Sequence, residues 1–240
     1  FVIVNPMKLF IPFFLFLGLS VAGGKTLDDV LTKARAYVGP EETINAVEVL
    51  FYNGTLAPAD GEASKSISLL LQKPAKQRLE ITEGNNRMTM VVNDEEGFMV
   101  RENVATGEKQ TMALPIQQVR LFTANAAENL YFFDFPPGIR VRAKYLGEQE
   151  FRGDTVDAVR FIHPHGIIFL RYFDTETGEL VGTQSDGSTI NIEEGEMTVG
   201  GLRFADKVLA YDSDELVHTI SFDRIEVNPD IPEGLFDYPE

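Results

Sequence analysis

The patterned part of the chain begins with a short amphipathic helix. Apolar residues recur at helical spacing in one narrow stripe, at Leu27, Val30, Leu31, Ala34 and Val38. Thr26 stands at the N-cap position and Asp29 follows three residues later, which is the spacing of a capping box. Gly39-Pro40 then ends the helix. Because so narrow a stripe must pack on another element, we expect the helix to lie on a sheet.

From about residue 46 onward, apolar and polar residues alternate with a period of two, which indicates half-buried strands. The alternating runs lie near residues 47–52, 78–81, 87–92, 139–145, 155–162, 166–173, 179–184, 188–193, 202–211 and 215–227. The clearest is Ile139–Tyr145, with apolar residues on one face and basic residues on the other. Turn residues separate the runs, for example Asp186-Gly187. Short strands at this spacing predict an antiparallel meander.

One segment in the middle of the chain does not alternate. Pro115 can open a helix. Apolar residues then recur at helical spacing, at Ile116, Val119, Phe122, Ala126 and Leu130. The aromatic segment Tyr131–Phe135 follows, ahead of two prolines, and such a segment cannot continue a regular helix. We therefore predict a second helix that ends at this aromatic segment.

A meander of about eleven strands cannot remain flat, because the twist of its strands makes the sheet curl. Beyond about eight strands, the interior of a curled sheet is too wide for its own side chains to fill. The inward positions are apolar, so either the hollow takes a hydrophobic ligand or the helices fill it completely. The predicted fold class is mainly β with few helices (α+β), an open antiparallel β half-barrel covered by helices.

The composition supports a single domain and excludes several kinds of chemistry. The chain has 240 residues, of which 44% are hydrophobic, enough for one core. Lys and Arg number 21 against 37 Asp and Glu, and the net charge of −16 disfavours nucleic acid as a partner. The absence of Cys removes disulfides, thiolate metal ligands, a thiol nucleophile and the lipidated cysteine of a lipoprotein.

Residues 1–22 have the features of a leader. Met7-Lys8 gives a short positive start, and an apolar run extends from Leu9 to Leu19. Ser20-Val21-Ala22 places small residues where a cleavage site requires them. The run is shorter than the roughly 18 residues of a spanning helix. We expect a secretory signal peptide cleaved after Ala22, with Phe1–Pro6 upstream of the true start, and a soluble exported protein.

The sequence offers little that is typical of a catalytic centre. It contains no phosphate loop, dinucleotide-binding motif, zinc-protease motif or nucleophile elbow. His163 and His165 stand two residues apart, but Pro164 and Gly166 predict a solvated hairpin rather than a metal site. His218 falls in register with apolar strand residues and is interpreted as a structural histidine. We expect a protein that is not an enzyme and has no catalytic residue, metal ion or cofactor.

Several features stand in a particular order along the chain. They are the signal peptide, the helix Leu27–Val38, a glycine-bearing strand ending at residues 52–56, a strand that closes on Lys73-Pro74, an acidic turn into an aromatic strand at 93–98, and the tail 228–236 with the pattern N-x-x-I-P-x-x-x-F. In this order the chain resembles the periplasmic outer-membrane lipoprotein-sorting carriers, the LolA/LolB-like family. The resemblance covers most of the chain after the signal peptide.

The resemblance implies an open antiparallel barrel with a lid of helices over an apolar cavity that holds lipoprotein acyl chains. It also implies that a basic residue before the strand's proline contacts the lid; Lys73 stands there, where the carrier has Arg. The implied domains are 1–22, upstream residues and signal peptide, and 23–240, one lipid-carrier domain. The implied location is the periplasm of a Gram-negative bacterium. The expected partners are acyl chains of lipoproteins or lipids, an inner-membrane donor and an outer-membrane acceptor, with no nucleic acid, and the protein is expected to be a monomer.

The predicted ligand-binding residues fall into two groups. Those expected to form the cavity wall are Leu69, Leu71, Leu79, Ile81, Met88 and Met90. Those expected to line the lid or the mouth, or else to pack in the core, are Phe122, Leu130, Phe132, Phe133 and Phe135.

Three functions remain open at this point. The first is a carrier, or chaperone, that transports lipoproteins or lipids toward the outer membrane by lipid binding. The second is a sensor or scaffold module on the same fold with a filled concavity. The third is a hydrolase of an envelope polymer, which requires two carboxylates, or a histidine and a carboxylate, in one cleft.

Overall fold

The computed structural model describes residues 24–185 and 189–239, which form three α-helices, two short 3-10 helices and fifteen strands. The helices are α1 (Leu27–Val38), α2 (Glu41–Asn45), α3 (Ile116–Leu130), η1 (Pro137–Ile139) and η2 (Pro164–Gly166). The predicted signal peptide, residues 1–22, and the predicted turn at Asp186-Gly187 lie outside the described residues. Within the described part of the chain, no helix has the length and apolar character needed to cross a membrane.

Nearly all the strands belong to one antiparallel sheet. The strands are β1 (Val49–Pro58), β2 (Lys65–Gln72), β3 (Lys76–Glu83), β4 (Asn86–Asn93), β5 (Glu96–Asn103), β6 (Glu108–Ala113), β7 (Arg142–Phe151), β8 (Asp154–Ile162), β9 (Ile168–Asp174), β10 (Leu180–Gln184), β11 (Thr189–Glu194), β12 (Met197–Val199), β13 (Leu202–Phe204), β14 (Lys207–Asp212) and β15 (Glu215–Val227). Thirteen of them pair in the order β6-β5-β4-β3-β2-β1-β15-β14-β11-β10-β9-β8-β7, and β12 pairs with β13 separately. The sheet is open, with β6 and β7 at its two ends.

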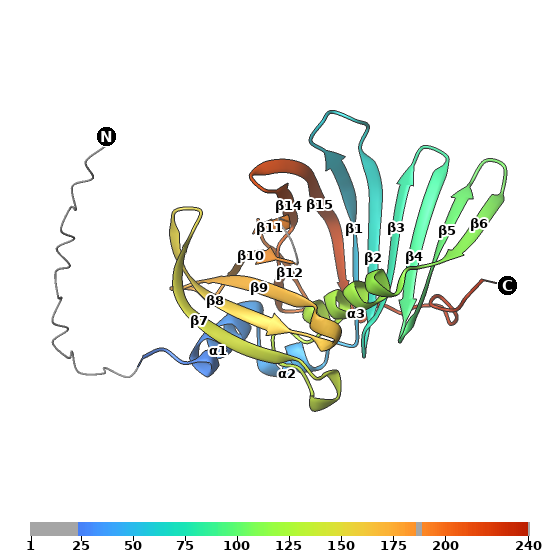
Figure 1. Ribbon diagram of the computed structural model, residues 1–240. Helices are drawn as coiled ribbons and strands as arrows, with labels where there is room; N and C mark the ends of the chain where they lie inside the picture. The colour runs from blue at the N-terminus through green and yellow to red at the C-terminus, as the bar shows by residue number, and fades with distance from the viewer. Residues whose placement is uncertain (1–23, 186–188, 240) are drawn as a thin grey trace, which may run out of the picture.

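The predicted fold class is therefore confirmed, with thirteen rather than about eleven strands in the main sheet. The edge strand β6 was missed because most of its residues are exposed on both faces, so the chain shows no alternation there. The predicted run 202–211 divides into β13 and β14, which belong to different sheets. Figure 1 shows the main sheet curling from the fan of β1–β6 round to β7–β9, with α3 inside the curl.

Local sequence rules account for α1. The Thr26 hydroxyl accepts a hydrogen bond from the Asp29 backbone N–H at 3.2 Å, and the Asp29 carboxylate accepts one from the Thr26 N–H at 2.8 Å. This is the predicted capping box. Val30 and Ala34 point from the helix into a core that includes Phe161 of β8. The predicted packing of the helix on the sheet is thus confirmed.

The aromatic segment after α3 ends that helix as predicted. Tyr131 is the C-cap residue, and the next two residues, Phe132 and Phe133, have positive φ angles of 45° and 73°. The chain then passes through η1, where Arg140 adopts a left-handed conformation. The strand predicted at 139–145 therefore starts later, at Arg142, because the residues before it form this turn.

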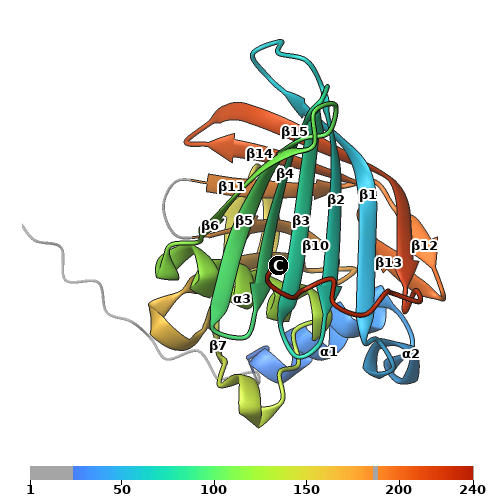
Figure 2. The ribbon, with the colours of Figure 1, turned by 90° about the vertical axis from the view of Figure 1, so that its right-hand side faces the viewer.

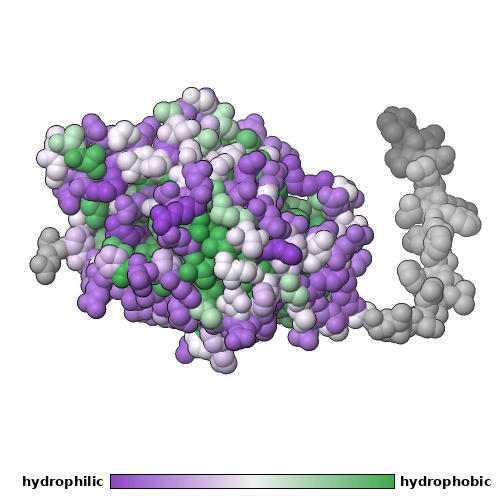
Figure 3. Space-filling view, turned by 180° about the vertical axis from the view of Figure 1, so that it is seen from behind, coloured by the Kyte–Doolittle hydropathy of each residue, from purple (hydrophilic) through white to green (hydrophobic). Residues whose placement is uncertain are grey.

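The C-terminal segment crosses the outer face of β1, β2 and β3, as Figure 2 shows. The ring of Phe236 packs in a small core with Val91 and Phe98, and the Arg78 Nη1 donates to the Leu235 carbonyl at 3.1 Å. The outer face of this half is thus partly covered by the chain's own tail. Seen from behind, the surface is mostly hydrophilic with a hydrophobic area near its middle (Figure 3).

Candidate functional site

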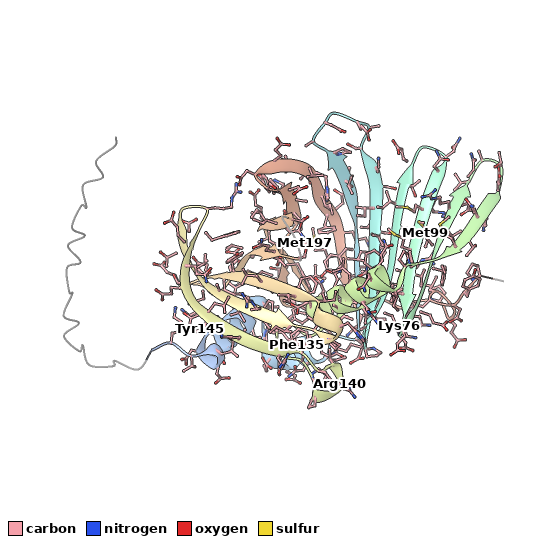
Figure 4. The ribbon with its side chains drawn as sticks, in the orientation of Figure 1. Lys76, Met99, Phe135, Arg140, Tyr145 and Met197 are labelled. Carbon is pink, nitrogen blue, oxygen red and sulfur yellow. The ribbon has the colours of Figure 1, made fainter. Side chains whose placement is uncertain are left out.

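The inner face of β1–β6, defined as the face that contacts α3, carries a continuous row of apolar side chains. Strand pairing places Leu69 opposite Leu79, Leu79 opposite Met90, Met90 opposite Met99, and Met99 opposite Met112. Directly opposed residues in an antiparallel pair share a face. The row therefore crosses five strands, about 19 Å at a strand spacing of about 4.8 Å. We call it the methionine row, and Met99 is labelled on β5 in Figure 4.

The other predicted wall residues lie on the same face. Ile81 stands opposite Met88, in a parallel row nearer the hairpin ends of β3 and β4. Leu71 is on the same face as Leu69, two residues farther along β2, and so lies on the other side of the methionine row from Ile81 and Met88. The structure thus brings all six predicted wall residues onto one face, and their role in binding a ligand is taken up as a proposal below.

The wall residues differ in how far α3 covers them. Leu71 and Met90 are buried beneath the helix. Leu79, opposite Met90, is half-buried, and so are Ile81 and Met88, which lie farther toward the turn between β3 and β4. The inner face is therefore sealed by α3 at one end and open at the other.

The half-buried end forms a hollow of about 430 Å³. Its apolar lining comes from Ile81 and Met88, two predicted wall residues. Its other lining residues are polar or charged, namely Lys65, Glu83, Asn86, Arg87, Arg101, Glu102, Asn103, Glu108, Lys109 and Gln110. An apolar floor with a charged rim is the kind of surface that suits an amphiphile.

Close approach of the helix to the sheet depends on Gly97 of β5. A Cβ atom at this position would lie 2.9 Å from Cγ2 of Val119 on α3, closer than packed atoms allow. Two polar contacts also hold the helix: Asn125 donates to the Gln77 side chain at 3.0 Å, and the Gln118 amide lies 3.6 Å from the Met90 sulfur. α3 is thus fixed along its length on the inner face.

Most residues predicted at the lid or mouth are enclosed. Leu130, Phe132 and Phe133 are buried in the two main cores, which corresponds to the core-packing alternative for them. Phe122 and Phe135 keep partial exposure. Phe135 packs against both cores, and Figure 4 shows it between α3 and the strands β7 and β8.

Lys73 lies beside the end of α3. Its Nζ is 5.3 Å from the ring centroid of Tyr131, a cation–π contact, and 3.5 Å from a carboxylate oxygen of Glu48. The residue predicted to touch the lid therefore contacts the C-cap residue of the inner helix. Its role as a latch remains a proposal.

Sequence reasoning missed Arg35, which holds the same aromatic turn from α1. Its guanidinium is buried and donates to the carbonyls of Tyr131 at 3.0 Å and Phe132 at 2.8 Å. It also pairs with Glu41 at 2.5 Å. The available signal was a cation four residues after Leu31 on an otherwise apolar stripe.

A buried group of ionisable residues joins α3 to the other half of the sheet. Glu128 of α3 contacts both the His163 ring nitrogen Nε2 and the Arg171 guanidinium of β9. All three side chains are almost fully enclosed. The prediction that His163 lies in a solvated hairpin is therefore wrong; the turn is real, but His163 faces inward against Phe135 and Phe169, and only His165 is exposed.

Glu193 of β11 is half-buried and lies near the Arg171 guanidinium of this group. Its carboxylate lies 3.4 Å from the Thr183 hydroxyl. Burial raises the pKa of Glu193 to about 7, and the nearby Arg171 guanidinium opposes that rise. The interior is thus not uniformly apolar.

The buried group bears on the hydrolase alternative, which required a histidine and a carboxylate in one cleft. His163 and Glu128 do meet, but their side chains are enclosed by the aromatic residues around them rather than placed in a cleft. Within residues 24–185 and 189–239, no cluster of three or more His, Cys, Asp or Glu side chains has a metal-binding arrangement. The geometry therefore favours a structural role for this group.

Comparison with known proteins identifies the fold. No protein-family model and no curated protein matches the chain. Among solved structures, a LolA superfamily protein from Nitrosomonas europaea aligns over 90% of this chain and 99% of its own, with a TM-score of 0.58 and 11% identity. An outer membrane lipoprotein-sorting protein domain from Vibrio parahaemolyticus aligns over 87% and 95%, with a TM-score of 0.55 and 9% identity.

A DUF1329 family protein from Desulfovibrio piger is equally similar in fold. It aligns over 90% of this chain and 98% of its own, with a TM-score of 0.58 and 6% identity. The fold of this chain is therefore LolA-like, as the resemblance predicted. At these identities the likeness concerns the fold alone.

Proposed function

We propose that the protein is a periplasmic carrier that binds the acyl chains of lipids or lipoproteins on the inner face of β2–β6. The observation that carries this proposal is the half-buried end of that face, where the methionine row and Ile81 and Met88 form an apolar surface beside an open hollow. Acyl chains gain about 0.8 kcal/mol for each buried CH₂ group, so a surface of this length is enough for reversible binding.

The fold supports the same proposal. One similar structure is described as an outer membrane lipoprotein-sorting protein domain, and another as a LolA superfamily protein. In this proposal, export is directed by residues 1–22, an inner-membrane donor delivers the cargo and an outer-membrane acceptor takes it. The protein performs no covalent chemistry on the cargo. Fractionation of cells that express the tagged protein tests its location.

A pair of neighbouring residues on opposite faces of β3 provides the binding test. Ile81 lines the hollow, whereas Thr82 faces outward, and both are half-buried. Ile81→Gln is expected to weaken binding of a fluorescent fatty-acyl probe about fivefold, because it removes about 1 kcal/mol of apolar contact. Thr82→Gln is the matched control and should leave the affinity unchanged.

Two outcomes would count against the carrier. If the purified wild-type protein binds no acyl probe, and native mass spectrometry finds no lipid after mild purification, the proposal is wrong. Equal effects of Ile81→Gln and Thr82→Gln would place binding elsewhere than on the inner face.

A second candidate is a sensor or scaffold module on the same fold. The observation in its favour is the dense packing around the C-terminal half of α3, where Leu130, Phe132 and Phe133 are buried in the two main cores. A protein that excludes every acyl probe but stays folded would favour this candidate.

A further inference from the structure

The rim of the open hollow contains one cation without an acidic partner. Four basic and three acidic side chains line this hollow, in a chain whose net charge is −16. Three of the four cations are paired: Lys65 with Glu83 at 3.4 Å, Arg87 with Glu102 at 2.6 Å, and Lys109 with Glu102 at 3.3 Å. Among the described residues, no carboxylate forms an ion pair with the fourth, Arg101.

Arg101 is placed directly beside the apolar floor. It lies on the inner face of β5, opposite Met88 on β4 and Gln110 on β6. Met99 of the methionine row lies two residues away on the same strand and face. Arg101 is exposed, whereas Met88 and Met99 are half-buried. A free guanidinium therefore stands where the apolar row meets solvent.

We infer that Arg101 binds the anionic head group of an amphiphile, a phosphate or a carboxylate, whose hydrocarbon chain lies over Ile81, Met88 and the half-buried members of the methionine row. This inference rests on the proposed function and adds the charge class of its ligand. A guanidinium can donate two parallel hydrogen bonds to such a head group. Methionine side chains are flexible and polarisable, so the row can adapt to chains of different shape.

Glu108, on the neighbouring strand β6, can compete with a ligand for the guanidinium. It lies on the inner face of β6, opposite Asn103 and diagonal to Arg101, and takes part in no described ion pair. An unpaired carboxylate one strand away on the same face weakens the electrostatic attraction of Arg101 for a second anion, although it forms no ion pair with the guanidinium. Removing the Glu108 charge should therefore strengthen the binding of an anionic head group.

The test compares three amphiphiles with the same alkyl chain, each below its micelle-forming concentration. Dodecyl phosphate is anionic, dodecyl maltoside is neutral and dodecyltrimethylammonium is cationic. By isothermal titration calorimetry, the wild-type protein is expected to bind dodecyl phosphate about tenfold more tightly than dodecyl maltoside. The cationic amphiphile should bind no more tightly than the neutral one.

Three variants test which residue causes the preference for the anionic amphiphile. Arg101→Gln should weaken dodecyl phosphate binding about tenfold and leave dodecyl maltoside unchanged. Glu108→Gln should strengthen dodecyl phosphate binding severalfold. Lys144→Gln is the control, because it removes the same charge from an exposed site on β7, at the opposite end of the sheet.

The outcomes separate this inference from the proposed function. Equal affinity for the anionic and neutral amphiphiles, unaffected by Arg101→Gln, would overturn the role of Arg101 and leave the carrier intact. Binding of inorganic phosphate as tightly as dodecyl phosphate would also overturn it, because the site would then recognise free phosphate. If no amphiphile binds the wild-type protein, the proposed function itself fails.

Discussion

Glu128 of α3 and Arg171 of β9 form an ion pair in the interior, with Oε2 of Glu128 2.7 Å from Nε of Arg171. The contact lacks hydrogen-bond geometry at these two atoms. The same carboxylate meets His163 through its other oxygen. One residue of the inner helix therefore joins the two halves of the sheet through buried charge, while the rest of α3 lies on β2–β5.

Breaking this pair from one side should be costly. Glu128→Gln or Arg171→Gln leaves a buried charge without its partner, and each is expected to lower the unfolding free energy by about 3–5 kcal/mol. The double variant Glu128→Gln, Arg171→Gln should lose less than the sum of the two single losses, because it removes both charges. Urea unfolding of the four proteins measures the coupling; strictly additive losses would contradict it.

Protonation of Glu193 should make stability depend on pH. Burial raises the pKa of this carboxyl to about 7 from 4.5. The folded state then holds the proton more tightly than the unfolded chain, so the stabilising contribution is complete below about pH 4.5 and is lost as the pH rises through 7. Because the residue keeps partial exposure, we expect a loss of about 1–3 kcal/mol.

The comparison protein for this measurement is Glu193→Gln, which cannot ionise. Its unfolding free energy should fall less than that of the wild type between about pH 4.5 and pH 8. Parallel pH profiles for the two proteins would show that the carboxyl does not titrate in this range.

Lys73 provides a test of the lid. Its cation–π contact with Tyr131 is worth about 0.5–1 kcal/mol, so Lys73→Gln should speed dissociation of a bound acyl probe about two- to fivefold. Lys73→Met, which keeps the length of the side chain but not the charge, should behave in the same way. Stopped-flow dissociation measures the rate, and an unchanged rate would assign Lys73 to structure alone.

Phe133 is expected to act through the core rather than through a ligand. Its ring is buried, packs edge-on against Phe173 at 4.9 Å and lies 5.2 Å from the Arg171 guanidinium. Phe133→Ala should lower the unfolding free energy by about 3–5 kcal/mol. A stable variant that has lost only probe binding would instead place this ring at the mouth of the cavity.

Local signals explain what could be predicted from the sequence. The capping box at Thr26 and the aromatic segment after Leu130 set the ends of two helices within a few residues. Strand alternation placed Leu79, Ile81 and Met88 on one face, because that face follows from a period of two. The same rule could not reveal β6, whose residues are mostly exposed.

Contacts between segments that are distant in the sequence could not be predicted from the hydrophobic pattern. Nothing near Glu128 signals that it meets His163 and Arg171, since the curl of the whole sheet brings them together. The one available signal was Arg171 itself, a charged residue between the inward-facing Phe169 and Phe173. How much of the inner face α3 covers was equally hidden, because periodicity assigns faces and not the elements packed on them.

A closed barrel has a circumference fixed by its strand number and stagger. In the described part of this chain, β6 and β7 are the edge strands and do not pair with each other, so strand number and stagger do not fix the width of the curled sheet. Changing strand twist alone can widen or narrow the curl without breaking a backbone hydrogen bond. The same sheet can then enclose ligands of different size, because the volume inside it depends on how far the sheet bends and not on a fixed barrel diameter.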